Sequence, residues 1–554
     1  MENPTQISRA QRLLTRRSLI KTATLAGGAL AVGTAAACTP DKTVETNKGE
    51  ANVNAQLPSY IPAELIKPDL PGDQVLMPGY YAYPQDPKQV FDTPPGAGLD
   101  KITIMYPTFI AAPPGPDRNT FYAQVQTELG AQLELQPIPN ADYGAKFQTT
   151  VAGGSLPDVM MFPLPTPDQP RVMERLFEDL GPYLAGDKVK DFPYLANIPE
   201  ASWKPAVSNG TIYAVPQPRS VAGGAMYFRR DLFDELQVNP EPASCAEFAE
   251  LCQAVTDPKK SRWAMANAPN ARGQIAEMLG APNGWTESGG EFTNAYADER
   301  TKESVARAAE LIKAGVFHPD AASASYTQFR DFFFAGRTVL LSDGYAGWEL
   351  FTRQLGGVVE GTGKLGLMML PKFDGGGDAP HFAGTGFQAI TVIKKGLGEE
   401  RTRGVLNVLN YLAAPIGSAE HLHRKYGVEG KDFTWADGLP TMTQQGTTNF
   451  LDLQYIVDAP TIIGPGPRDG VDRQHAWHQR ATADLVKDPS IGLYSDTASR
   501  KKNTLDKVIG DAVTGIMFGR NPLSDYDEAF AKWRSEGGDK IAAEYGEAFQ
   551  AANG

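Results

Sequence analysis

The feature that most constrains the fold is the segment 209–255, where two strand signals separated by turns are followed by a helix signal. After an Asn-Gly turn, the β-branched and aromatic run 211–215 predicts a short strand. A Gly-Gly break precedes the apolar run 225–228, which predicts a second, buried strand. Ser244 and Glu247 have the spacing of a capping box, which marks a helix start. This order predicts that one lobe ends here, that the chain crosses over, and that a second lobe begins.

The length of the chain supports the expectation of more than one lobe. The chain has 554 residues, which is too many for a single hydrophobic core. Before the crossing, strand signals at 101–106, 133–137 and 158–162 alternate with helix signals at 117–129 and 142–152. Such alternation predicts a parallel α/β sheet.

These regions resemble the family 1 extracellular solute-binding proteins of bacterial ABC importers, which are relatives of maltose-binding protein. The resemblance rests first on NGTIYAVPQ and MYFRRDLFDELQVNPEPASCAEF in the crossing segment. Residues 153–159 match the family pattern G-x-x-P-D-V, and residues 334–341 resemble its element F-x-x-G-x-x-A-M, with Leu341 in place of Met. The tail 518–549 resembles the longer, oligosaccharide-binding members. The resemblance covers about residues 101–554.

The resemblance implies an α/β, two-lobed periplasmic-binding-protein-like fold of type II. Each lobe would hold a mostly parallel sheet flanked by helices, with a ligand cleft between the lobes. Two crossings, near 215–228 and 382–387, would form a hinge about which the lobes close on the ligand. We therefore expect a first lobe of 100–217 and 387–430, and a second lobe of 218–386 and 431–554.

The N-terminus carries an export signal in residues 1–37. Arg16-Arg17 lies in a twin-arginine pattern, and the mild Gly/Ala-rich run after it is too short to span a membrane. Residues 35–38 resemble a lipobox, which predicts a lipid on Cys38 and a membrane anchor on the outer side of the cell. Ala35 stands where Leu is usual, so ordinary signal-peptidase cleavage is the alternative. Because the signal is basic, the mature chain is more acidic than the net charge of −13 of the full sequence.

Residues 38–99 are rich in proline, with ten in this stretch. Such a composition predicts a semi-rigid tether that holds the body off the membrane. The aromatic run Tyr80-Tyr81-Ala82-Tyr83 leaves docking onto the body as an alternative.

Several classes of function are disfavoured. The negative net charge and the lack of a basic patch argue against nucleic acid as a partner. No Gly-x-Ser-x-Gly, His-Glu-x-x-His, Cys-x-x-Cys or P-loop motif is present. His475 and His478 have helical metal spacing, but the six histidines offer no evident third ligand, so we expect neither a metal nor a cofactor. Cys245 and Cys252 would lie roughly 10.5 Å apart along a helix, too far for a disulfide.

Candidate ligand contacts follow from how proteins bind sugars, with aromatic faces against C–H surfaces and planar polar groups on hydroxyls. The main candidate is Trp348 on the turn 343–348, because the matching turn of maltose-binding protein relatives carries a sugar-stacking Trp. Tyr106 ends the first strand, where open α/β sheets bind ligands. Asp158 either contacts the ligand or caps its loop. The full set of candidates is Tyr106, Asp158, Arg219, Trp285, Asp343, Tyr345 and Trp348.

Together these features predict a substrate-binding lipoprotein of an ABC importer. It would capture a carbohydrate, with an oligosaccharide as the expected ligand, and deliver it to the permease subunits in the membrane. We expect a monomer that is not an enzyme. Two alternatives stay open: a secreted glycan-cleaving enzyme, which needs two carboxylates flanking a glycosidic bond, and a sugar sensor or adhesin without a permease.

Overall fold

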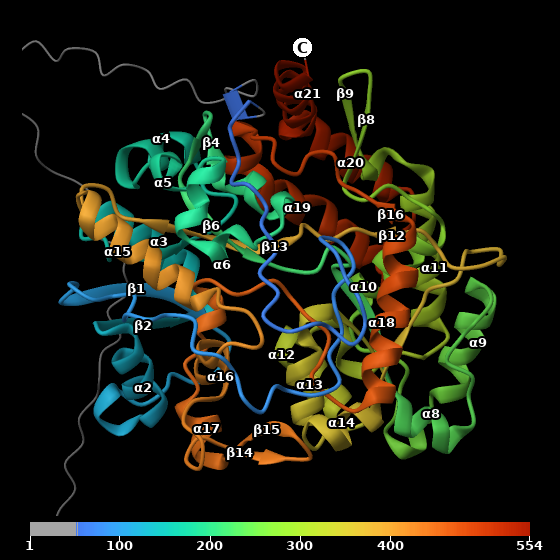
Figure 1. Cartoon of the computed structure of the whole chain (residues 1–554). Coiled ribbons are helices and arrows are strands. Elements are labelled where there is room, and N and C mark those ends of the chain that lie inside the picture. Colours follow the sequence, from blue (N-terminus) through green and yellow to red (C-terminus); the bar gives the residue numbers. More distant parts are fainter. Residues whose placement is uncertain (1–50, 53, 554) are drawn as a thin grey trace, which may run out of the picture. The chain divides into compact units, whose positions relative to one another are not determined.

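The computed structural model of the chain describes residues 51–52 and 54–553, which belong to one compact unit, Glu45–Gly554 (Figure 1). The expected export signal 1–37, Cys38 and the start of the Pro-rich segment lie outside the described residues. Within the described residues, no helix combines the length and the apolar character that a membrane crossing requires.

The first lobe is built on a five-stranded sheet. Its strands, in spatial order, are β2 (Gln132–Pro139), β1 (Lys101–Thr108), β3 (Val159–Phe162), β13 (Phe387–Ile393) and β6 (Ala214–Pro218). β1 pairs in parallel with β2 and β3, which confirms the parallel α/β pattern expected for this region. β13 is antiparallel to β3 and β6, because the chain enters this strand on its return from the second lobe. β6 tolerates its two prolines because it lies at the edge of the sheet.

The first lobe extends further along the chain than we expected. Its buried core includes Leu451, Leu453 and Val457, so the region 433–457 packs with the first lobe, whereas we expected all of 431–554 in the second. The physical reason is local, since a hairpin in this region packs on α16 (Ala419–Tyr426) and the helix after it packs on α2. The hairpin is β14 (Phe433–Ala436) and β15 (Leu439–Met442). The other helices are α2 (Thr120–Leu129), α3 (Asn140–Gly153), α4 (Gln169–Leu176), α5 (Gly181–Leu184), α6 (Pro193–Ala196), α7 (Glu200–Trp203), α15 (Glu399–Leu412) and α17 (Gln444–Asn449).

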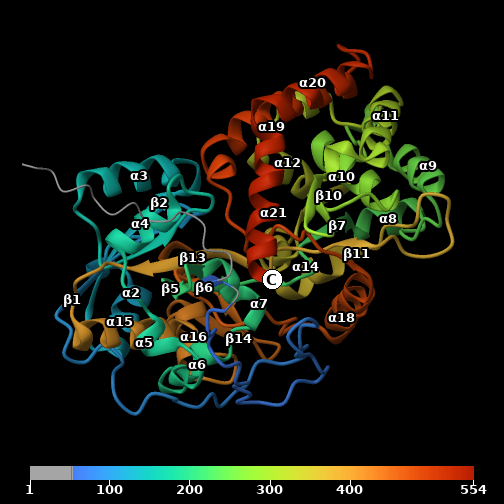
Figure 2. The same ribbon diagram turned by 90° about the horizontal axis from the view of Figure 1, so that it is seen from above.

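The second lobe holds a three-stranded sheet in the order β10 (Leu340–Gly344), β7 (Gly224–Arg229) and β11 (Leu365–Met368). Both outer strands run antiparallel to β7, whereas we expected a mostly parallel sheet in each lobe. The helices of this lobe pack on the sheet or on one another (Figure 2). They are α8 (Arg230–Leu236), α9 (Cys245–Val255), α10 (Ala268–Met278), α11 (Glu299–Lys313), α12 (Tyr326–Phe334), α13 (Trp348–Gln354), α14 (Val358–Lys364), α18 (Arg468–Ala483), α19 (Asp496–Met517), α20 (Asp525–Trp533) and α21 (Asp539–Asn553).

Local signals in the sequence place several of these helices. The hydroxyl of Ser244 accepts a hydrogen bond from the backbone N–H of Glu247 at 3.2 Å, which confirms the predicted cap of α9.

Cys245 and Cys252 lie on this helix as free thiols. Burial raises the pKa of Cys245 to about 11 and that of Cys252 further, so neither thiol is reactive at neutral pH.

The chain passes between the lobes three times. The first two crossings, 218–224 and 382–387, lie where the sequence predicted them, and the third, 457–468, had no signal. The first two touch at Gly223 and Gly384, where a Cβ added to Gly223 would lie 2.7 Å from the Cα of Gly384. Gly223 also has a φ of +63°, so both space and backbone conformation require glycine there.

The Pro-rich segment, expected to be a tether, lies on the body in its described part 54–99. Pro58 bridges Gly186 and Lys88 bridges Ser418, both in the first lobe. Tyr80 and Tyr83 are buried with residues of the first lobe, which matches the docking alternative offered by the tyrosine run. This segment is held by isolated β-bridges rather than by a continuous ladder of paired strands. Its prolines lack the backbone N–H that such a ladder needs.

Candidate ligand-binding cleft

A cleft of about 590 Å³ lies between the two lobes, and the Pro-rich segment also lines it. The described residues expose six large hydrophobic side chains, and four of these, Val75, Phe109, Ile110 and Tyr326, line this cleft. Its size is that of a small-molecule site, and exposed apolar side chains gathered in a cleft mark a binding surface.

The first lobe contributes an aromatic corner. The rings of Phe109, at the end of β1, and Tyr455 lie 4.6 Å apart, and the guanidinium of Arg219 lies 5.9 Å from the Tyr455 ring. Asp452 fixes this corner, because its Oδ2 accepts from the backbone N–H of Phe109 at 3.2 Å and from the hydroxyl of Thr108 at 3.1 Å. Phe109 therefore keeps its backbone in place while 42% of its surface stays exposed.

The second lobe faces this corner with a polar and aromatic cluster. The hydroxyl of Tyr326 donates to Asp343 at 2.7 Å, and Nε of Arg330 donates to the other carboxylate oxygen at 2.8 Å. The Arg330 guanidinium also stacks 4.4 Å from the Tyr326 ring and donates to its hydroxyl. This ring is 48% exposed, so its outer face is open to a ligand.

Charged groups of both walls act on the hydroxyl of Tyr455. Burial, followed by the charge of Asp452, raises the pKa of Tyr455 to about 12, while the charges of Arg219 and Arg330 lower it. Since Arg330 belongs to the opposite lobe, Tyr455 senses charge from both sides of the cleft. Burial and the neighbouring Asp343 raise the pKa of Tyr326 as well. Both phenols therefore stay neutral at physiological pH. The single hydroxyl proton of Tyr326 is donated to Asp343, so of the two phenols Tyr455 is the one that can donate a hydrogen bond to a ligand hydroxyl.

Four of the seven sequence candidates line the cleft: Arg219, Asp343, Tyr345 and Trp348. Tyr345 is buried, with its ring stacked on Trp477 at 5.4 Å and its hydroxyl bonded to Gln474 at 2.9 Å. Trp348 is half-buried at the start of α13 and lies 6.4 Å from the ring of Tyr227. Trp348 therefore both packs against Tyr227 and lines the cleft. Tyr345 lies beneath the cleft surface and supports it by packing.

The other three candidates lie outside the cleft lining. Tyr106 is fully buried, and its hydroxyl donates to the carbonyl of Leu451 at 2.6 Å. The carboxylate of Asp158 accepts hydrogen bonds from the backbone N–H of Thr103 and from Arg401, both at 3.0 Å. Asp158 therefore has a structural role, which was the alternative to a ligand contact. Trp285 packs in the second lobe, where it lies 5.2 Å from the ring of Tyr545.

Sequence reasoning missed three aromatic residues of the cleft, of which Phe109 and Tyr326 are exposed. Phe109 follows the first strand, Tyr326 begins α12 and Tyr455 lies in a short 3-10 turn, Leu453–Tyr455. None belongs to a motif, and the region 431–496 showed none at all. Of the three, Phe109 alone could have been predicted, because it follows a strand of a parallel sheet, where such sheets bind ligands.

Most charged groups of the cleft are already paired. Lys425 of the first lobe lies 3.5 Å from Glu349 of the second, and the charge of Lys425 is the main cause that lowers the pKa of Glu349 to about 2. Arg353 approaches the same carboxylate at 3.4 Å. The described residues hold no cluster of three or more His, Cys, Asp or Glu side chains suited to a metal ion. His475 and His478 instead bond to Pro71 and Ser220.

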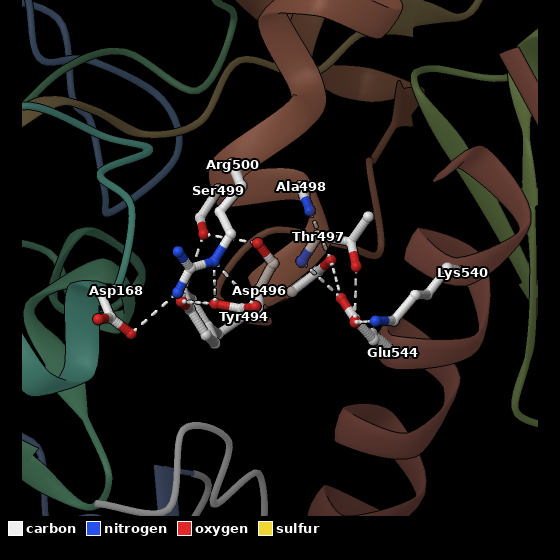
Figure 3. A network of polar contacts seen from close by, with 10 residues as sticks. Asp168, Tyr494, Asp496, Thr497, Ala498, Ser499, Arg500, Lys540 and Glu544 are labelled. Carbon is white, nitrogen blue, oxygen red and sulfur yellow. Dashed lines mark hydrogen bonds and ion pairs between the residues drawn. The ribbon is translucent and has the colours of Figure 1, made fainter. Parts of the chain in front are cut away.

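A second ion pair joins the lobes outside the cleft. Arg500 of α19 lies 3.2 Å from Asp168, which precedes α4 of the first lobe (Figure 3). Glu544 of α21 holds the start of α19 through Ser495 and Thr497. Both side chains of the pair are substantially exposed, so its contribution to holding the lobes together is small.

Two lobes, three crossings and a cleft lined by exposed aromatic and polar side chains define a protein that binds a small ligand between its lobes. The chain belongs to the bacterial extracellular solute-binding proteins, because the sequence profile described as Bacterial extracellular solute-binding protein matches residues 112–396. Members of this family are binding proteins that act outside the cell.

Individual relatives share modest identity over most of the chain. The polygalacturonan/rhamnogalacturonan-binding protein YtcQ of Bacillus subtilis (strain 168) is 23% identical over 455 residues, which are 79% of this chain and 89% of the relative. Lipoprotein LipO of the same organism is 19% identical and covers 82% of this chain and 93% of its own length. The crystal structure of the N-glycan transport solute binding protein NgtS from Streptococcus pneumoniae has a TM-score of 0.59 at 16% identity, covering 82% of this chain and 98% of that one. This similarity shows a shared fold.

Proposed function

We propose that this protein is the substrate-binding lipoprotein of an ABC importer and that it captures an oligosaccharide in the cleft for delivery to a membrane permease. The observation that carries the proposal is the pair of exposed rings, Phe109 and Tyr326, which enter the cleft from opposite lobes. Sugar rings stack on such faces, while Arg219 and Tyr455 offer hydrogen bonds to hydroxyl groups.

The relatives support a carbohydrate ligand. YtcQ is named for binding polygalacturonan and rhamnogalacturonan, and NgtS has been crystallised with Man1GlcNAc and with Man5GlcNAc. The cleft acids Asp343 and Asp452 are each engaged by hydrogen bonds from neighbouring groups, which suits a binding role better than a pair of acids poised for hydrolysis.

A panel of oligosaccharides tests this function by thermal shift and calorimetry. A ligand present at a hundred times its dissociation constant should stabilise the protein by about 2.7 kcal/mol. The same incubations, followed by analysis of the sugars, should return each oligosaccharide intact. Cleaved products would favour the enzyme alternative, and a panel without any binder would contradict the proposal.

Anchoring through Cys38 is part of the proposed function. We expect that Cys38→Ala releases the exported protein from the membrane fraction into the medium, because the thiol would carry the lipid. The twin-arginine residues supply a second test, since Arg16→Lys with Arg17→Lys should block export of the folded chain. Membrane retention of the Cys38→Ala protein would contradict the lipid anchor.

Closure of the lobes on the ligand is a further expectation. The three crossings, 218–224, 382–387 and 457–468, are where such a hinge would rotate. Small-angle X-ray scattering with a saturating oligosaccharide should give a smaller radius of gyration than the free protein. Equal radii would contradict hinge closure.

A further inference from the structure

One segment of the cleft wall comes from neither lobe. The N-terminal strap, defined as residues 57–92, contributes Tyr60, Glu64, Asp73, Gln74 and Val75 to the lining. Its composition predicted a tether outside the folded body, and nothing in the family pattern assigns it a role.

The strap is fixed to the first lobe at both of its ends. The backbone N–H of Ile61 donates to the carbonyl of Ala196 at 2.9 Å, and that of Lys88 donates to the carbonyl of Gly417 at 2.9 Å. The backbone N–H of Val90 donates to the carboxylate of Glu420 at 3.0 Å.

The middle of the strap is fixed to the second lobe. Met77 is 4% exposed and packs in the second-lobe core, and the hydroxyl of Tyr81 donates to Asp472 at 2.6 Å. Nε2 of His475, on α18, lies 2.9 Å from the carbonyl oxygen of Pro71. The strap therefore contacts both lobes, and Figures 1 and 2 show it in blue.

Between these contacts, residues 72–76 form a tight loop that lines the cleft. Oδ1 of Asp73 accepts from the backbone N–H of Val75 at 2.6 Å and of Leu76 at 2.7 Å, which sets the shape of the loop. The amide oxygen of Gln74 accepts from the backbone N–H of Glu200 of the first lobe at 3.2 Å. Val75 stays 43% exposed, which makes it one of the four exposed large hydrophobic side chains in the cleft.

From this placement we infer that the strap is the third wall of the binding site and that its loop 72–76 contacts the bound oligosaccharide. This inference rests on the proposed function. The chemistry suits a sugar, since Val75 offers an apolar contact to C–H groups and Gln74 and Asp73 offer planar polar groups to hydroxyls. The loop and the residue before it contact both lobes, through Gln74 to Glu200 and through Pro71 to His475.

The test compares two double variants of the full mature chain. Gln74→Ala with Val75→Ala removes two of the side chains that line the cleft and keeps Asp73, which holds the turn. Asp86→Ala with Gln89→Ala is the matched control, because both residues are exposed strap residues outside the cleft lining. The probe is the tightest binder among maltotriose, mannotriose, xylotriose and trigalacturonate, measured by calorimetry.

We expect the loop variant to bind this probe roughly tenfold more weakly, and the control to bind within about twofold of the unchanged protein. Amide hydrogen exchange should also slow at 72–76 on addition of the probe and stay unchanged at 85–89. A folded loop variant with unchanged affinity would overturn the strap's role and leave the proposed function intact. Failure of the unchanged protein to bind any of the four probes would contradict both.

Discussion

Tyr326→Ala is expected to weaken oligosaccharide binding by about 10- to 100-fold, which corresponds to roughly 1.4 to 2.8 kcal/mol. The ring is 48% exposed at the start of α12, so its loss removes a stacking surface without opening a core cavity. Phe109→Ala should have an effect of similar size from the opposite wall, because its ring is also exposed and is held in place through its backbone.

Two controls separate stacking from other roles of Tyr326. Tyr326→Phe keeps the ring but removes the hydroxyl that bonds to Asp343, so we expect only a small loss of affinity. Leu523→Ala truncates an exposed apolar side chain outside the cleft lining and should leave both affinity and stability unchanged. Calorimetry and melting curves without ligand provide the two readouts. Unchanged affinity of a folded Tyr326→Ala protein would contradict the stacking role.

The helices and strands that could be predicted are those whose sequence pattern lies within the element itself. The strand expected at 101–106 is β1 (Lys101–Thr108), and the helix expected at 142–152 is α3 (Asn140–Gly153). Periodicity and end signals suffice there, because a buried parallel strand and an amphipathic helix each carry their own pattern. The crossings near 215–228 and 382–387 were likewise found, since turn residues mark both.

Which side chains face the cleft could be predicted only in part. Trp348 and Trp285 both follow glycine-containing turns, yet the first lines the cleft and the second packs against Tyr545 in the second lobe. The direction of a ring depends on packing between distant segments, which no local pattern records. Tyr455 illustrates the same limit, because its position is set through Asp452 and the end of β1, more than three hundred residues earlier.

The strap shows a different limit. Proline-rich composition predicts extended backbone without a strand ladder, and this description fits a free tether and a docked segment equally well. What distinguishes them here is the burial of Met77, Tyr80 and Tyr83 against partners far away in the sequence. The run of tyrosines indicated that the segment could dock on the body, but the sequence did not indicate which surface the tyrosines would contact.

Acid is expected to destabilise the protein through His478. This side chain is fully buried on α18 at the first crossing, where its Nε2 lies 2.6 Å from the hydroxyl of Ser220. Burial, together with the charges of His475 and His381, lowers its pKa to about 4, and only Asp73 of the strap acts in the opposite direction. In the unfolded chain the same imidazole has a pKa near 6.5.

The sign of the effect follows from which state binds the proton first. Above pH 6.5 both states are neutral at this site, and the full stability is present. As the pH falls from 6.5 to about 4, the unfolded state becomes protonated while folded His478 stays neutral, so the free energy of unfolding decreases. A difference of this size in pKa corresponds to about 3 kcal/mol, and below pH 4 the site causes no further loss.

His478→Gln is the variant that isolates this effect, because glutamine retains a polar partner for Ser220 and does not titrate. Urea unfolding at pH 7 and pH 4 should show that the native protein loses about 3 kcal/mol more than the variant over this range. Comparing the two proteins removes the opposing contribution of His381, whose pKa is raised by its bond to Glu277 and whose stabilisation is present at low pH and lost as the pH rises. If the free energy of unfolding falls by the same amount in both proteins between pH 7 and pH 4, protonation of His478 does not destabilise the folded state. The loss of stability in acid would then come from other groups.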